Sequence, residues 1–136
     1  MVIPNIEYED RFTNMKLKEI ALEFLDQNNF LFQENTKSSG ISGQEYTFQF
    51  LITGQKTHST NDNISTGIIL KDYKKSVGSD GICQAERLLK DCPEINKVVM
   101  ISNEFSVPAR NLARRCGVPL ISRGELISML IKPKSV

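Results

Sequence analysis

Apolar residues along this chain recur at two spacings, and these spacings predict the order of its helices and strands. The first stretch, "TNMKLKEIALEFLDQNNF", has apolar residues three and four apart, which predicts a helix with Thr13 or Asn14 as its N-cap. Asn28 and Asn29 are expected to end that helix. The next residues, "FLFQE", predict a short strand, and the polar run "NTKSSGISG" predicts a loop.

Strict alternation follows and predicts an antiparallel pair of strands. In "QEYTFQFLIT", the pattern puts Tyr46, Phe48, Phe50 and Ile52 on one face of a strand. A polar stretch then leads to "GIILKDY", which predicts a third strand pairing with the second. A helix is expected from about Ser79, with its apolar residues Ile82, Ala85, Leu88 and Leu89 facing inward.

The last third of the chain carries clear start and stop signals. Pro93 follows the second helix, and the apolar "KVVMIS" predicts a buried central strand. Ser106 or Val107 precedes Pro108 at the start of the next helix, and Gly117 stands at its end. After a short strand "VPLIS", Ser122 and Glu125 have the spacing of a capping box for a final helix. The predicted order is α-β-β-β-α-β-α-β-α.

The bulk composition predicts one soluble domain. The chain has 136 residues, of which 40% are hydrophobic and 24% charged, so we expect a single domain over residues 1–136 with a core over about 13–131. The chain lacks an apolar run of membrane-spanning length, and its acidic first residues do not resemble a signal peptide, so a cytoplasmic location is expected.

Cys83, Cys92 and Cys116 form no CxxC motif and are expected to be buried free thiols. The single histidine, His58, falls in a polar loop and is expected at the surface.

Charge is unevenly divided along the chain. Residues 1–70 hold five Lys/Arg and nine Asp/Glu, a net charge of −4, whereas residues 71–136 hold twelve and seven, a net charge of +5. A basic second half permits a surface that faces nucleic acid. Basic side chains gather after the third strand, in "IILKDYKKSVG", where a strand end reaching water is the simpler interpretation.

The order of elements and two motifs resemble the Mrr-type restriction endonucleases, members of a nuclease superfamily with the restriction endonuclease-like fold. "IILKDYKKSVG" is similar to the family's catalytic strand and Val-Gly turn, and "FSVPARNLARRCGVPLISRGEL" is similar to its later segment. The resemblance covers most of residues 13–130. It implies an α/β fold with a mixed central sheet flanked by helices.

The resemblance also implies a metal-dependent site. In the family, a carboxylate on the second strand and an acidic or amide residue on the third hold a divalent metal, usually Mg²⁺, and a lysine two positions later stabilises charge on the phosphate. These positions fall on Gln49, Ile69 and Lys71. A shifted site could use Asp72, with its acid-x-lysine spacing to Lys74, but alternation puts both on the opposite strand face from Lys71.

A third carboxylate could come from the first helix, where Glu19 and Glu23 also suit a solvated face. Three functions therefore stay open: an Mg²⁺-dependent DNA endonuclease with a shifted site, a nucleic-acid-binding relative with impaired cleavage, and a non-catalytic interaction or oligomeric module. The second is favoured, and DNA or another nucleic acid is then the expected partner, with a homodimer left open and no membrane. The residues expected to contact nucleic acid are Lys71, Lys74, Lys75, Gln84 and Arg87.

Overall fold

The computed structural model describes residue 12 and residues 14–56 and 65–131, and within them the predicted order of helices and strands is confirmed. The elements are α2 (Leu17–Gln27), β1 (Phe30–Ser39), β2 (Glu45–Gln55), β3 (Thr66–Lys71), α3 (Ser79–Asp91), β4 (Lys97–Ser102), α4 (Val107–Cys116), β5 (Leu120–Ser122) and α5 (Arg123–Ile131). His58 and Thr13 lie outside the described residues. Within the described part of the chain, no helix has both the length and the apolar character of a membrane span.

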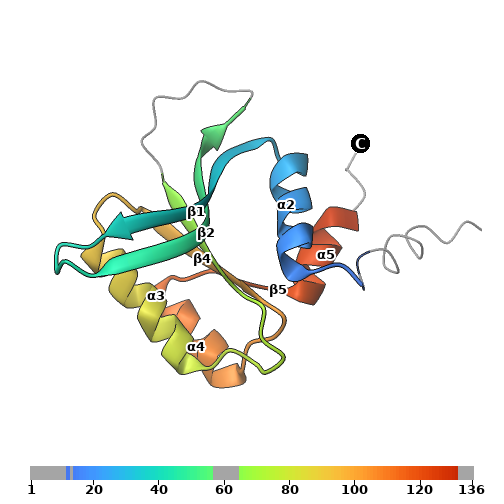
Figure 1. Ribbon diagram of the computed structural model, residues 1–136. Coiled ribbons are helices and arrows are strands. Elements are labelled where there is room, and N and C mark those ends of the chain that lie inside the picture. The colour runs from blue at the N-terminus through green and yellow to red at the C-terminus, as the bar shows by residue number, and fades with distance from the viewer. Residues whose placement is uncertain (1–11, 13, 57–64, 132–136) are drawn as a thin grey trace, which may run out of the picture.

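The strands form one mixed sheet in the order β1-β2-β3-β4-β5. β1, β2 and β3 pair antiparallel, whereas β3, β4 and β5 pair parallel because α3 and α4 form the crossovers between them. Helices α2 and α5 lie beside one face of the sheet, and α3 and α4 lie beside the other (Figure 1). The predicted mixed sheet with helices on both faces is therefore confirmed.

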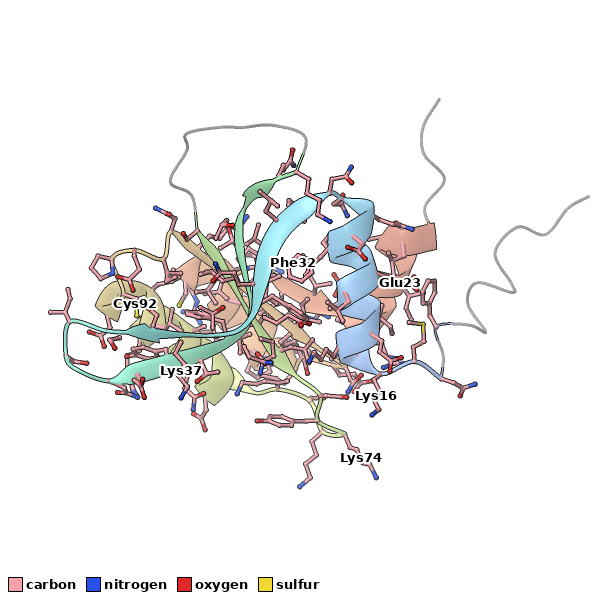
Figure 2. The ribbon with its side chains drawn as sticks, turned by 45° about the horizontal axis from the view of Figure 1, so that its top comes forward. Lys16, Glu23, Phe32, Lys37, Lys74 and Cys92 are labelled. Carbon is pink, nitrogen blue, oxygen red and sulfur yellow. The ribbon has the colours of Figure 1, made fainter. Side chains whose placement is uncertain are left out.

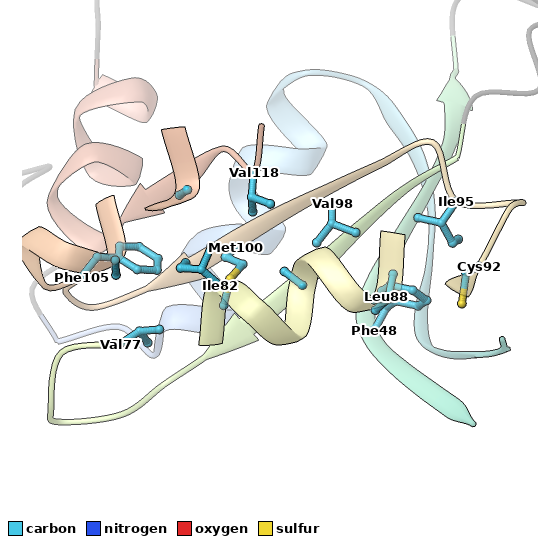
Figure 3. Packing of buried hydrophobic residues seen from close by; sticks show 13 residues of the cluster. Phe48, Val77, Ile82, Leu88, Cys92, Ile95, Val98, Met100, Phe105 and Val118 are labelled. Atoms are coloured by element: carbon cyan, nitrogen blue, oxygen red, sulfur yellow. The ribbon is translucent and has the colours of Figure 1, made fainter. Parts of the chain in front are cut away.

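Each face of the sheet has its own hydrophobic core. One cluster joins α3 and α4 to the sheet through residues such as Phe48, Ile82, Leu88 and Met100, which are buried completely or nearly so (Figure 3). The other joins α2 and α5 to Phe50, Ile68 and Ile101, among others. Neighbouring residues of β4 alternate between the two cores, as Met100 and Ile101 do, which is the pattern of a central strand covered on both sides.

Strand β2 changes faces part-way along its length, and here the predicted alternation is wrong. Tyr46 and Phe48 pack in the core beneath α3, whereas Phe50 and Ile52 pack in the core on the side of α2. Opposite this change, Asn35 of β1 has a left-handed backbone with φ 50°. A left-handed residue breaks the two-residue repeat, so the outer half of the β1–β2 hairpin turns towards α3.

Two local predictions are also corrected, and a third is confirmed. Strand β1 runs ten residues because it pairs with β2 as far as Ser39, so most of the expected loop is strand. Helix α2 begins at Leu17 with Lys16, not Asn14, as its N-cap. Helix α3 begins at Ser79, as predicted, with Gly78 as its N-cap.

The cysteine prediction is confirmed in part, since all three thiols are free. Cys92 is buried and Cys116 is half-buried, but Cys83 is exposed. Cys83 is exposed because it falls on the polar side of α3, on the same side as Glu86, Arg87 and Lys90.

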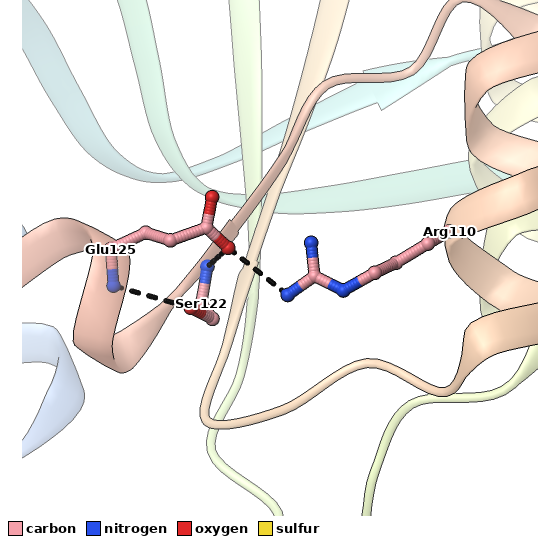
Figure 4. A network of polar contacts seen from close by, with 3 residues as sticks. All are labelled: Arg110, Ser122 and Glu125. Atoms are coloured by element: carbon pink, nitrogen blue, oxygen red, sulfur yellow. Dashed lines mark hydrogen bonds and ion pairs between the residues drawn. The ribbon is translucent and has the colours of Figure 1, made fainter.

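The segment from α4 to α5 follows its sequence signals closely. Ser106 caps α4 by accepting a hydrogen bond from the Ala109 backbone N–H at 3.2 Å, and Gly117 ends the helix with φ 72°. The predicted capping box is present: the Ser122 N–H donates to Glu125 at 3.3 Å, and the Glu125 N–H donates to the Ser122 hydroxyl at 3.2 Å. Glu125 also pairs with Arg110 at 3.0 Å, which ties α5 to α4 (Figure 4).

Candidate nucleic-acid interface

The site begins where β2 and β3 separate. Their backbone pairing covers Ile52↔Thr66, Leu51↔Gly67 and Phe50↔Ile68, and it ends there. One step further, the Leu70 backbone N–H donates to the side-chain oxygen of Gln49 at 2.8 Å. The Gln49 side chain therefore takes the place of a strand partner at the point of divergence, where the buried ladder would otherwise leave a donor unsatisfied.

A groove of about 330 Å³ opens between the outer half of the hairpin and α3, and we call it the Lys71–Arg87 groove. Lys71 at the end of β3 and Gln84 and Arg87 on α3 line it together, with Ile69 and Leu88 as apolar neighbours. Gln44, Tyr46 and Thr47 of the hairpin complete its lining. None of these described lining residues is a carboxylate, so the groove offers two cations and several hydrogen-bonding groups to an anion.

The hairpin wall of the groove is fastened to the end of α3 by Asp91. Its carboxylate accepts hydrogen bonds from the Ser42 hydroxyl at 2.6 Å, the Ser42 backbone N–H at 2.9 Å and the Tyr46 hydroxyl at 2.8 Å. These bonds, those of Ser42 foremost, lower the pKa of Asp91, and the bond to Asp91 raises the pKa of Tyr46. A second hollow, of about 570 Å³, adjoins the groove through Tyr46 and Arg87 and includes Asp91 in its lining.

The predicted nucleic-acid residues divide into two groups. Lys71, Gln84 and Arg87 meet in the groove, whereas Lys74 and Lys75 lie exposed on the turn after β3, outside its lining. Figure 2 shows Lys74 at the outer end of this turn, pointing away from the sheet and helices. The two lysines therefore add positive charge to the surface beyond the groove but do not form part of its wall.

The candidate carboxylates do not join the groove. Asp72 is exposed and accepts a hydrogen bond from the Asn103 side chain at 2.8 Å, on the turn side of the strand end. Glu19 is exposed on α2, and α2 packs against the opposite face of the sheet from Ile69. Neither residue lines the space beside Lys71.

A model of the family Mrr_cat, described as restriction endonuclease, matches residues 10–130. This chain belongs to the Mrr_cat restriction endonuclease family. The match spans nearly every described element, from the start of α2 to the last turn of α5. The family resemblance expected from the catalytic strand and the later segment is thus confirmed.

Solved structures agree with the restriction endonuclease-like fold. A protein of unknown function, AF1548, has a TM-score of 0.66 and 14% identity, with 86% of this chain and 67% of that chain covered. The protein VC1899 from Vibrio cholerae has a TM-score of 0.59 and 15% identity, with coverage of 88% and 33%. This chain therefore spans about two thirds of the first and one third of the second. No curated protein matches the chain.

The resemblance implies a Mg²⁺ site at Gln49 and Ile69, beside Lys71. Mg²⁺ prefers carboxylate oxygens in near-octahedral geometry. At the two positions that the resemblance assigns to metal ligands, this chain has Ile69, which has no donor atom, and Gln49, whose neutral oxygen already accepts a hydrogen bond from Leu70. Among the described residues, no group of three His, Cys, Asp or Glu side chains could hold a metal ion. The described residues at this position do not fit a magnesium site.

The sequence did not reveal the residues that hold the groove in shape but do not line it. Asp91 and Ser42 hold the hairpin wall, and Asn103 holds the turn after β3. Each contact joins residues at least 31 positions apart, so no local pattern could reveal it. The left-handed Asn35 had one weak signal, because asparagine is among the residue types that adopt positive φ most readily.

Proposed function

We propose that this member of the Mrr_cat family binds nucleic acid through the Lys71–Arg87 groove and has impaired metal-dependent cleavage. The observation that supports the proposal is the composition of the groove, where two cations converge beside Ile69 and none of the described lining residues is a carboxylate. Phosphate groups are the anions that such a nuclease fold would meet. DNA is the first substrate to test because the family consists of restriction endonucleases.

The two cations are available to a ligand. Among the described residues, neither Lys71 nor Arg87 forms an ion pair, whereas Arg110 and Lys90 are each paired with a glutamate. A phosphate that enters the groove would therefore not have to displace a carboxylate. The amide of Gln84 and the hydroxyl of Thr47 add neutral hydrogen-bonding groups at the same site.

A binding assay with fluorescently labelled duplex and single-stranded DNA over a range of salt concentrations tests this proposal. In the variant Lys71→Ala/Arg87→Ala we expect weaker binding at every salt concentration and a salt slope reduced by about two units, roughly one per lost phosphate contact. Arg114→Ala/Arg115→Ala, which removes two exposed charges from α4, is the matched control and should keep both the affinity and the slope. Equal losses in the two variants would refute a role for the groove.

Cleavage is tested separately with supercoiled DNA and Mg²⁺ or Mn²⁺. We expect no nicking above background, because the ligand positions carry Gln49 and Ile69. Nicking that disappears in Asp72→Ala would instead establish an active endonuclease with a shifted site. Failure of the parent chain to bind any nucleic acid, even at low salt, would favour the interaction-module hypothesis.

A further inference from the structure

The turn after β3 is anchored at both ends. The Asn103 side chain donates to the Asp72 carboxylate at 2.8 Å and to the Tyr73 backbone oxygen at 2.9 Å. At the far end, the Val77 N–H donates to the Glu104 carbonyl at 2.9 Å, and Val77 pairs in parallel with Phe105. The residues between these anchors are therefore held against the loop that joins β4 to α4.

On this anchored turn, Tyr73 presents its ring to solvent. Its side chain is 53% exposed, and the Lys71 ammonium lies over the ring, 5.4 Å from the centroid. Within the described residues, its hydroxyl has no hydrogen-bond partner. Tyr46 differs in each respect, since it is half-buried and its hydroxyl is bonded to Asp91. The position of Tyr73 thus contributes little to the core.

The surroundings of Tyr73 indicate what could cover it. Lys71 lies over the ring and also lines the groove, and the exposed Lys74 and Lys75 follow Tyr73 on the same turn. An apolar protein surface packed on this ring would have to desolvate the lysines without pairing them. A nucleotide offers both a phosphate for the lysines and a flat aromatic base for the ring.

We propose that Tyr73 is a stacking platform for an unpaired base, and that the ligand of the Lys71–Arg87 groove is single-stranded nucleic acid. This inference rests on the proposed function. In a duplex, both faces of each internal base are already stacked, so an exposed ring beside a phosphate site gains contacts only from an unpaired base. Base–aromatic stacking tolerates any sequence, because every base has a π-face.

The test compares three ligands: a single-stranded oligonucleotide, the same strand with abasic sites, and a duplex half as long, so that all three carry about the same number of phosphates. We expect the parent to prefer the single strand. Tyr73→Ala should lose about tenfold in affinity for the single strand, and Tyr73→Phe should keep it. Affinity for the duplex and the abasic strand should be unchanged in Tyr73→Ala, because the phosphate contacts remain. Parallel assays with DNA and RNA of one sequence distinguish the two sources of single strands.

A second variant reports contact directly. The chain contains no tryptophan, so Tyr73→Trp introduces a single indole fluorophore. Its emission should be quenched by the base-bearing strand and not by the abasic strand. Quenching of equal size with both, or parent-like single-strand binding by Tyr73→Ala, would overturn the stacking role while leaving nucleic-acid binding intact. Absence of binding to all three ligands would overturn both proposals.

Discussion

The junction between β2 and β3 and the segment from α4 to α5 are built by opposite means. In the later segment, Ser106, Gly117 and the Ser122–Glu125 pair act on backbone groups within a few residues of themselves. At the junction, the decisive contacts are those of Gln49 with Leu70 and of Phe48 with Gly67, about twenty positions apart. In this chain the supporting frame is therefore specified locally, whereas the groove depends on how distant strands meet.

A substitution at the contact between Phe48 and Gly67 is expected to destabilise the junction more than the other changes considered below. A Cβ at Gly67 would lie 2.4 Å from the ring of the fully buried Phe48, so Gly67→Ala should lower the free energy of unfolding by about 1 to 3 kcal/mol. Urea unfolding measures the loss. Gly124→Ala is the matched control, because no atom of the described residues lies within 4 Å of the added methyl, and the helix should gain up to about 1 kcal/mol. A Gly67→Ala variant as stable as the parent would contradict the packing described.

Removing the hydrogen bond from Leu70 to Gln49 should destabilise the same junction by a smaller amount. Gln49→Ala leaves a half-buried backbone N–H without its acceptor and should cost about 1 to 2 kcal/mol of unfolding free energy. Gln49→Glu keeps an acceptor oxygen and should stay close to the parent at neutral pH. Equal destabilisation of the two variants would show that the length of the side chain, and not its acceptor, supports β3.

A local cap in the later segment gives the smallest effect of the three. Ser106→Ala removes the acceptor for the Ala109 N–H and should cost about 1 kcal/mol, whereas Ser106→Asp should restore most of it. Ser128→Ala, an exposed position within α5, serves as the control and should be neutral or slightly stabilising. If Ser106→Ala also weakened DNA binding at constant stability, the separation between frame and groove would be wrong.

The same division explains how much of the molecule could be predicted from its sequence. Capping residues and apolar periodicity act over a few residues, so the order of elements, the ends of α4 and the start of α5 were predictable. The change of face between Phe48 and Phe50 was not, because it depends on Asn35 in the paired strand. Lys71, Gln84 and Arg87 were predicted together through the family resemblance, but nothing in the sequence could show Asp91 fastening the groove wall.

The hydrogen bond between Gln49 and Leu70 also limits the order of substitutions by which two metal ligands could be introduced at Gln49 and Ile69. Exchanging Gln49 for aspartate shortens the side chain and removes its support for β3 before any second ligand is present. Exchanging Ile69 for glutamate places a lone carboxylate beside Lys71, where the two charges would pair with each other. The first exchange alone loses the support of β3, and the second alone pairs Lys71 with a carboxylate. Only the two exchanges together supply two metal ligands. The two positions are therefore expected to be epistatic, so that the effect of either exchange depends on whether the other has been made.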